Sequence, residues 1–381
     1  MHYLDHAATT PMLPEVREAM EPYLADDFGN AASVHAYGRR AKQGVEDGRD
    51  RIAAAVGAKP AEIVFTGGGT EADNLALIGT VTKLRGNGNH VVTTAFEHHA
   101  VLHSVDWLRD QGFETAIIPV PESGIVDPQQ VAAAVRPDTI VVSVMAVNNE
   151  IGTIQPLSDI VRLVKEANPR TLVHTDAVQA LPNIPVDVGH WGVDLAALSA
   201  HKVGGPKGVG ALFVRSGVPV SPTMHGGGHE RGLRSGTLNV PGIAGFGVAA
   251  ELAAKEVHEK IDRLEPLRDA LVDGFLKIVP DAVINGDREN RIAANASIAI
   301  PGAEGEVLLL LFDEAGIACS TGSACQSGAV DPSHVLLAIG RSKELANGTL
   351  RFSLGRTSTR ADIDAVLGAL PEIARRARRA A

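Results

Sequence analysis

Cysteine is scarce in this chain, which has only Cys319 and Cys325 among its 381 residues. The two lie six positions apart and form no Cys-x-x-Cys pair, so we expect no zinc or iron–sulfur site built by this chain alone. The same scarcity excludes a secreted scaffold held together by disulfides. A chain with so few cysteines can still contain a single reactive thiol.

Long apolar segments are also missing, since no run approaches the roughly 18 residues that a membrane span needs. The N-terminal MHYLDHAATTP does not combine a basic region with an apolar one, so we expect no signal peptide. The net charge of −10 argues against a nucleic-acid-binding surface as the main function. We therefore expect a soluble, cytoplasmic protein of about two domains, with no membrane and no direct nucleic-acid partner.

Short β-rich runs alternate with helical patterns through the first half of the chain. Strands separated by helices indicate a parallel sheet with helices on both faces, which is an α/β fold. The predicted strands are residues 62–66, 90–95, 115–120, 139–146, 171–175 and 194–199.

Polar residues follow four of these strands at the points where the strands end. In open α/β sheets, ligands bind beyond the carboxyl ends of the strands, so these side chains are expected to share one site. They are Glu97-His98-His99, Asn148-Asn149-Glu150, Asp176 with Gln179, and Ser199 with His201 and Lys202.

Lys202 follows the apolar run Leu195–Leu198 and precedes a glycine-rich turn. Burial of a lysine amine disfavours its charged form, which lowers its pKa and makes it a usable nucleophile. Beside a hydroxyl and an imidazole, such an amine suggests a Schiff-base lysine. The alternative is that Lys202 extends to solvent and the glycines only shape a hairpin.

A second signal is the strand at 62–66, followed by Gly67-Gly68-Gly69 and a helix that opens at Thr70 and runs towards Val81. Free amides at a helix N-terminus favour an anion, so this arrangement suits a phosphate. The alternative is that Thr70 is simply an N-cap, with Asp73 beside it.

The last third of the chain has a different pattern. Residues 241–279 predict a long helix that links two domains. The remainder predicts a smaller α+β unit with strands at 296–300 and 350–354 and a helix at 304–315.

Between the helix at 304–315 and the strand at 350–354 lies a loop at about 318–332, whose small and polar composition predicts flexibility. Cys325 in this loop is a reactive-thiol candidate, whereas Cys319, close to Ile317, fits an inert thiol.

Taken together, these motifs resemble the cysteine desulfurases, in the group that contains NifS and IscS. The resemblance extends over nearly the whole chain and in the family's order. The motifs are LDHAATTP at 4–11, GTEADNLAL at 69–77, EHHAVL at 97–102, NNEIG at 148–152, HTDAVQ at 174–179, SAHKVGGPKGVGAL at 199–212, HGGGHERGLRSGTLN at 225–239, STGSACQSG at 320–328 and RFSLGR at 351–356.

The resemblance implies a fold-type I enzyme that depends on pyridoxal 5'-phosphate and forms a homodimer. It implies a large domain, residues 15–255, with a mostly parallel seven-stranded sheet. A smaller α+β domain would comprise residues 1–14 and 256–381 and carry the cysteine loop.

The resemblance also assigns roles to residues of the site. Lys202 would bond the cofactor, Asp176 would face its pyridine nitrogen and Gln179 its phenolic oxygen, while His98 would stack on the ring and assist catalysis. The phosphate would be held by Gly69, Thr70, Ser199, His201 and, from the partner subunit, Thr237. Asn149 would contact both cofactor and substrate, and the substrate carboxylate would be bound by Arg351, with Arg356 as a second candidate.

The implied reaction takes sulfur from L-cysteine, leaving L-alanine and a persulfide on Cys325. The sulfur would then pass to an iron–sulfur scaffold protein or another acceptor, and also serve tRNA or cofactor thiolation. The alternatives are a selenocysteine lyase, another lyase or aminotransferase of the same fold, and a non-catalytic scaffolding subunit. The mobile cysteine argues against an aminotransferase, and retention of Lys202, Asp176 and Cys325 argues against a scaffolding subunit.

Overall fold

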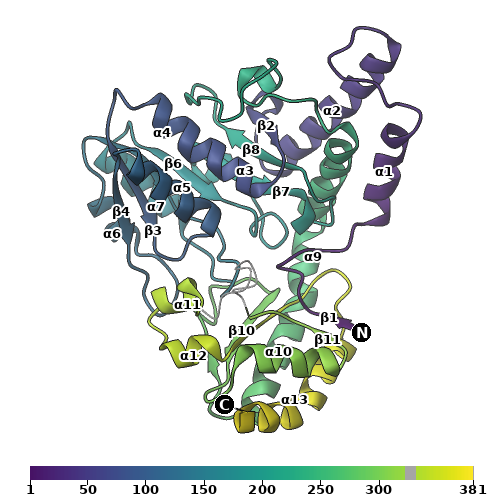
Figure 1. The fold of residues 1–381 in the computed structure, drawn as a ribbon, viewed down its shortest axis with the longest axis vertical. Coiled ribbons are helices and arrows are strands. Elements are labelled where there is room, and N and C mark those ends of the chain that lie inside the picture. Colours follow the sequence, from purple (N-terminus) through teal and green to yellow (C-terminus); the bar gives the residue numbers. More distant parts are fainter. Residues whose placement is uncertain (322–331, 381) are drawn as a thin grey trace.

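The computed structural model describes residues 1–321 and 332–380 (Figure 1). Its main element is a seven-stranded sheet in the order β2-β8-β7-β6-β5-β3-β4. Only β8 runs antiparallel to its neighbours, which confirms the predicted mostly parallel sheet. The strands are β2 (Ile63–Thr66), β3 (His90–Thr94), β4 (Glu114–Ile118), β5 (Thr139–Ser143), β6 (Leu172–Asp176), β7 (Leu195–Ser199) and β8 (Gly210–Val214).

Helices cover both faces of this sheet because successive strand residues point to opposite sides. Val91 and Val141 pack in one cluster with α5 residues such as Val105, whereas Val92 and Val142 belong to the large core cluster. The helices of this part are α1 (Pro14–Leu24), α2 (Ala36–Ala55), α3 (Gly69–Asn74), α4 (Thr80–Lys83), α5 (His99–Asp110), α6 (Pro128–Ala133), α7 (Leu157–Ala167) and α8 (Val188–Trp191).

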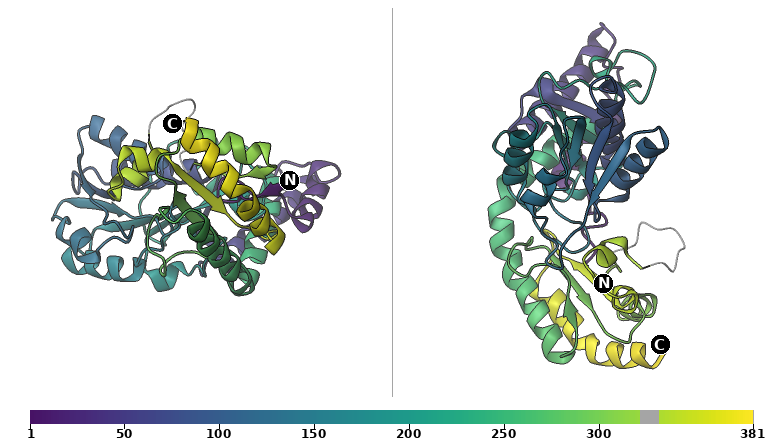
Figure 2. Two further views of the ribbon diagram at one scale, coloured as in Figure 1. Left: turned by 90° about the horizontal axis from the view of Figure 1, so that it is seen from below. Right: turned by 90° about the vertical axis from the view of Figure 1, so that its left-hand side faces the viewer.

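The long helix α9 (Val240–Ile278) runs from this part into a smaller one, as the right-hand view of Figure 2 shows. The smaller part contains an antiparallel sheet in the order β12-β10-β9 and, parallel to each other, β1 and β11. Its elements are β1 (His2–Tyr3), β9 (Val283–Ile284), β10 (Asn295–Ala299), α10 (Gly305–Glu314), β11 (Ile317–Ala318), α11 (His334–Ala338), α12 (Lys343–Asn347), β12 (Thr349–Ser353) and α13 (Arg360–Ala380).

Residues 1–13 form an arm that joins the two parts. The arm starts in the smaller part, where β1 pairs with β11 and Asp5 bridges to Ser353. It then crosses to the glycine-rich turn after β7, where the amide of Leu13 donates to the carbonyl of Gly204. The arm therefore brings its own backbone beside Lys202.

The sequence predicts the cysteine loop at about 318–332, but the first residues of that range are paired with strands. Ala318 is paired in β11, and Ser320 exchanges backbone hydrogen bonds with Arg351 of β12. Ser333 is already the N-cap of α11. Sheet pairing thus holds the first three residues of the predicted loop, and Cys325 lies outside the described residues.

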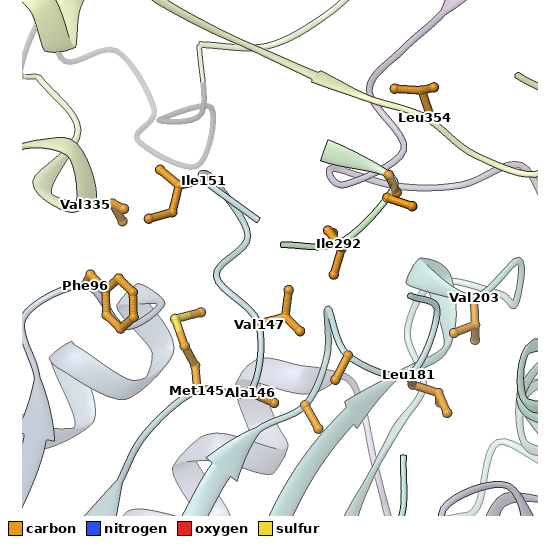
Figure 3. Packing of buried hydrophobic residues seen from close by; sticks show 14 of the residues in the cluster. Phe96, Met145, Ala146, Val147, Ile151, Leu181, Val203, Ile292, Val335 and Leu354 are labelled. Carbon is orange, nitrogen blue, oxygen red and sulfur yellow. The ribbon is translucent and has the colours of Figure 1, made fainter. Parts of the chain in front are cut away.

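The apolar core continues from one part into the other. Figure 3 shows Phe96 and Met145 of the larger part near Val335 of α11, with Val147 near Ile292. All five side chains are at most 4% exposed. Burial of this apolar surface stabilises the arrangement of the two parts around the site between them.

Within residues 1–321 and 332–380, no helix combines the length and apolarity required to traverse a bilayer.

A buried ion pair holds the segment after β8 against β2. The guanidinium of Arg49 donates two hydrogen bonds of 2.8 Å to the carboxylate of Glu230, and both side chains are at most 5% exposed. The amide of Phe65 donates to the same carboxylate at 2.8 Å. Glu230 adopts a φ of 46°, so this pairing also holds a backbone conformation that non-glycine residues rarely adopt.

We predict that Glu230→Ala lowers the free energy of unfolding by about 3–5 kcal/mol, because it leaves the buried Arg49 with only the exposed Glu46, at 3.1 Å, as a carboxylate partner. Guanidinium denaturation measures this change. The control is Glu251→Ala, which removes an exposed pair with Arg51 and Lys255 and is expected to cost about 1 kcal/mol or less. Equal losses in the two variants would contradict the prediction.

Candidate active site

The carboxyl edge of the large sheet brings several predicted site residues together. Asp176 ends β6 and Ser199 ends the neighbouring β7, which is followed by a short 3-10 turn at Ala200–Lys202. His98 follows β3 and is the N-cap of α5, where its Nδ1 accepts a hydrogen bond of 3.1 Å from the amide of Ala100. Because β3, β6 and β7 run parallel in the same sheet, the residues that follow them lie at its carboxyl edge.

Asp176 lies at the centre of this group. It is 6% exposed, and its carboxylate accepts a hydrogen bond of 2.9 Å from the amide of Val178. Burial raises the pKa of Asp176, and the charges of His98 and Lys202 oppose that rise. Side-chain ligand atoms of Asp73, His98 and Asp176 all lie within 4.8 Å of one another.

The amine of Lys202 reaches the N-terminal arm. It donates to the carbonyls of Ala7 at 2.6 Å and Ala8 at 2.8 Å. The side chain of Gln179 donates to the same Ala7 carbonyl at 2.9 Å, so the arm connects these two predicted residues. The alternative in which Lys202 extends freely to solvent is therefore wrong.

His201 also faces the arm, with its Nδ1 3.2 Å from the hydroxyl of Thr9. Burial, assisted by the nearby Lys202 and Lys207, lowers the pKa of His201 to about 4. The imidazole is therefore uncharged at neutral pH and suited to hydrogen bonding.

The helical segment after β2 begins at Gly69, so the alternative that makes Thr70 its N-cap is wrong. A Cβ on Gly69 would lie 2.7 Å from Val178 and 3.5 Å from Ser199, which explains why glycine stands there. Thr70 is exposed and lies in the first turn, where backbone amides have no partner within the helix. The predicted helix to Val81 is helical throughout, with a π-helical stretch at Leu75–Gly79.

Arg351 and Asn149 also lie together. The 3% exposed Arg351 donates to the carbonyl of Asn149 at 2.9 Å and to the carboxylate of Asp5 at 2.9 Å. Asp5 is therefore a carboxylate already seated on the guanidinium that we expect to bind a substrate carboxylate. Arg356, in contrast, is exposed and pairs with Glu256 at 2.9 Å.

Three further positions named in the sequence analysis are Thr237, Cys325 and Cys319. Thr237 is exposed, and its role in the partner subunit stays a prediction. Cys325 lies outside the described residues. Cys319 is described, and burial raises the pKa of its thiol to about 12, as expected for an inert cysteine.

The sequence does not indicate the contact between Asp73 and His174 behind the site. Asp73 is fully buried, with one carboxylate oxygen 3.4 Å from Nε2 of His174. His174 contacts the hydroxyl of Ser143 at 2.8 Å, and burial lowers its pKa to about 3. Burial, with Asp176 and Glu97 nearby, raises the pKa of Asp73 well above its usual range. The motifs GTEADN and HTDAVQ contain Asp73 and His174, but nothing in their spacing indicates this contact.

A cavity of about 340 Å³ opens beside Lys202. Asn149, Gln179 and Lys202 line it from the sheet, and Arg356 lines it from the smaller part. A cavity of this size is typical of a small-molecule site.

The sheet order, the smaller antiparallel part and the long connecting helix together define the fold-type I architecture of pyridoxal-phosphate enzymes. Comparison of this chain with known protein families and solved structures gives the same class. The model of the Aminotransferase class-V family matches residues 2–366. A solved structure described as a NifS-like protein has a TM-score of 0.92 and 39% identity, covering 98% of this chain and 99% of its own.

Curated relatives narrow the class. Cysteine desulfurase IscS of Methanosarcina thermophila is 48% identical over 376 residues, which cover 99% of this chain and 92% of that protein. Cysteine desulfurase IscS 1 of Archaeoglobus fulgidus is 46% identical over 378 residues, covering 99% and 98%. A structure titled SspA in complex with cysteine has a TM-score of 0.82 and 35% identity, covering 94% and 100%. This chain belongs to the class-V aminotransferase family and, within it, to the cysteine desulfurases.

The pKa of Glu97 yields a prediction for stability. Burial raises this pKa to about 8, against hydrogen bonds from Thr94 at 2.6 Å and the Met145 amide at 2.9 Å. A folded-state pKa above the unfolded value of about 4.3 means that the folded state holds the proton longer. The stability contributed by Glu97 is therefore full below about pH 4 and is lost as the pH rises to about 8.

We predict that Glu97→Gln, which keeps the shape without the ionisation, reduces the loss of Tm between pH 5 and pH 8. Differential scanning calorimetry of both proteins at the two pH values measures the difference. Glu166→Gln, on the exposed face of α7, serves as the control and should leave the wild-type pH dependence intact. Identical pH dependence in Glu97→Gln and wild type would contradict a raised pKa at Glu97.

Proposed function

We propose that this protein uses pyridoxal 5'-phosphate to remove sulfur from L-cysteine, releasing L-alanine and leaving the sulfur as a persulfide on Cys325. The observation that carries the proposal is the convergence of Lys202, Asp176 and His98 at one sheet edge, in a chain similar over its length to cysteine desulfurases. The cysteine bound in the similar SspA structure supports a small amino-acid substrate.

The residues present fit the cofactor. Asp176 is a buried carboxylate suited to a protonated ring nitrogen, and Gln179 offers an amide to the phenolic oxygen. The crowding around Gly69 brings the first turn of α3 against Ser199, where the unpartnered amides suit a phosphate. His98 would stack on the ring and Lys202 would hold the cofactor through its amine. Ser199, His201, Thr70 and the partner's Thr237 would complete the phosphate site.

When bound, pyridoxal phosphate stores the electron pair that is left when the α-proton of the substrate is removed. Once the amine of the substrate has taken its place on the cofactor, the freed Lys202 would accept that proton at Nζ, and His98 would transfer a proton through its imidazole. Arg351 binds the substrate carboxylate as a fork in place of Asp5, and Asn149 helps to orient the substrate.

In the proposed sulfur transfer, the thiolate of Cys325 accepts the sulfur atom, and no external oxidant is needed. The Cβ–S bond of the substrate breaks, and its electron pair stays on carbon, which takes a proton to become the methyl group of alanine. The sulfur atom forms an S–S bond with the thiolate of Cys325. A second thiol of an acceptor then attacks the outer sulfur.

We infer that the acceptor is an iron–sulfur scaffold protein or another sulfur carrier, and that the protein works as a cytoplasmic homodimer. The names of the relatives support the sulfur-mobilising role. We also propose the division into a large domain at 15–255 and a small domain at 1–14 and 256–381. The pairing of β1 with β11 supports counting the arm with the small domain.

We predict that Lys202→Ala loses both the visible absorption of bound cofactor and alanine formation from L-cysteine. Cys325→Ser should keep the absorption but form no alanine, because the cofactor site is intact while the sulfur has no thiolate to receive it. The control Cys319→Ser should keep both, since its thiol is buried. Absorption spectra and alanine assays measure these outcomes. Undiminished alanine formation in Cys325→Ser would indicate a lyase, such as a selenocysteine lyase, instead.

We predict that Arg351→Lys raises the KM for L-cysteine about 10- to 100-fold, because lysine cannot form the two parallel hydrogen bonds of the fork. Arg356→Lys should change KM less than about twofold, since Arg356 is exposed and paired with Glu256. Steady-state alanine formation measures both values. The reverse result would assign the carboxylate to Arg356, the second candidate.

A further inference from the structure

The N-terminal arm forms hydrogen bonds around Lys202 that no step described above requires. Figure 1 shows this arm in purple between β1 and α1. The amine of Lys202 donates to the carbonyl of Ala7 at 2.6 Å and to that of Ala8 at 2.8 Å. A carbonyl oxygen can only accept a hydrogen bond, so this pair of acceptors favours the ammonium form of Lys202, which has three N–H donors.

Thr10 holds this stretch of the arm against the turn that carries Lys202. Its hydroxyl donates to the carbonyl of His201 at 2.8 Å and accepts from the amide of Gly204 at 2.8 Å. Its amide donates to the same His201 carbonyl at 3.0 Å. These three bonds reach the turn on both sides of Lys202, so Thr10 fixes the separation between the turn and the arm.

The carbonyl of Ala7 is also held by contacts with both parts of the molecule. It accepts from the side-chain amide of Gln179 in the larger part at 2.9 Å. The amide of Ala7 donates to the hydroxyl of Ser353 in β12 at 2.9 Å. The acceptors of the Lys202 amine are therefore in place before a charge forms on it, and the arm does not have to reorganise when it does.

Removal of the substrate α-proton creates such a charge on Lys202. The Cα–H bond of the substrate breaks, its electron pair stays with the substrate and cofactor, and the proton forms the third N–H bond of Nζ. Preorganised dipoles that face a developing charge lower the barrier of the step that creates it. The amine becomes neutral again when it gives the proton up, so the step needs no further acid or base.

We propose that Thr10 is a positioning residue for proton transfer by Lys202, because it keeps the carbonyls of Ala7 and Ala8 where they receive the ammonium. The inference rests on the role of Lys202 in the proposed function. Thr10 acts through the arm, so its loss should slow the proton transfer and leave the affinity for the substrate unchanged.

The first test is exchange of the α-proton of L-alanine in D2O by the cofactor-loaded protein, followed by proton NMR. This exchange reports proton transfer alone, because alanine has no sulfur to lose. Thr10→Val keeps the shape of the side chain and removes both hydroxyl bonds. It should lower the maximal exchange rate about 10- to 100-fold, with the half-saturating alanine concentration unchanged. Thr10→Ser restores the hydroxyl and should exchange within about threefold of wild type.

The matched control is Thr171→Val. Thr171 is buried just before β6, at the opposite edge of the sheet from the site, and its hydroxyl donates to the carbonyl of Thr139 at 2.9 Å. This variant loses a comparable hydrogen bond to a carbonyl, so it should be less stable but exchange the α-proton at the wild-type rate.

The second test needs no cofactor. The full-length protein, freed of cofactor, is treated briefly with acetic anhydride, and acetylation of Lys202 is measured by peptide mass spectrometry. Acetylation needs the lone pair of a neutral amine, so an ammonium held between two carbonyls reacts slowly. Acetylation of Lys202 should rise about two- to tenfold in Thr10→Val, as expected when a hydrogen bond is weakened. The exposed Lys255 gives the reference rate in each protein.

Unchanged exchange or unchanged acetylation of Lys202 in Thr10→Val would overturn the inference, and so would a failure of Thr10→Ser to restore the exchange. In those cases the wild type still exchanges the α-proton, and the proposed function stands. A wild-type protein that exchanges no α-proton would overturn the proposed function and this inference together. Circular dichroism confirms that each variant is folded, and Thr10→Ala takes the place of Thr10→Val if the latter is not.

Discussion

The burial of acidic side chains at the carboxyl edge of the large sheet is the constraint on which the site depends. Asp73, Glu97 and Asp176 are nearly inaccessible to solvent, and burial raises the pKa of each. Removing a carboxylate from water is costly unless it is protonated or faces a positive charge. The edge therefore favours groups that bring a proton or a cation to Asp176, as His98 and Lys202 do and as the proposed pyridine ring would.

The site also depends on the N-terminal arm, residues 1–13, because the arm contacts residues of both the larger and the smaller part of the molecule. Its carbonyls hold Lys202 and Gln179, and its Asp5 occupies Arg351. One short segment thus contacts both the group that would bond the cofactor and the group that would bind the substrate. In the proposed role of Arg351, a substrate carboxylate would have to compete with Asp5 for the guanidinium.

The apolar core continues across the boundary between the two parts. Its close packing fixes the positions of the elements that carry the site residues. Phe96, Met145 and Val335 pack against one another beside the strand ends. Close-packed interiors transmit small displacements, so α5 and α11 hold their side chains at defined separations. His99 on α5 and His334 on α11 are near neighbours for this reason, with ring centroids 4.4 Å apart although they lie far apart in the sequence.

The sequence by itself determined the α/β class, six strands of the large sheet to within a few residues, and the candidate site residues at the strand ends, because hydrophobic periodicity and strand-end polar groups are local features. It did not indicate β8, the antiparallel strand of that sheet. Family motifs supplied the roles of the site residues. The contacts that set the chemistry depend on residues far apart in the chain: Lys202 with Ala7, Arg351 with Asp5, Arg49 with Glu230, and His334 with His99. Only the tertiary structure decided these, since strand order, burial and the path of the arm arise from packing of the whole chain.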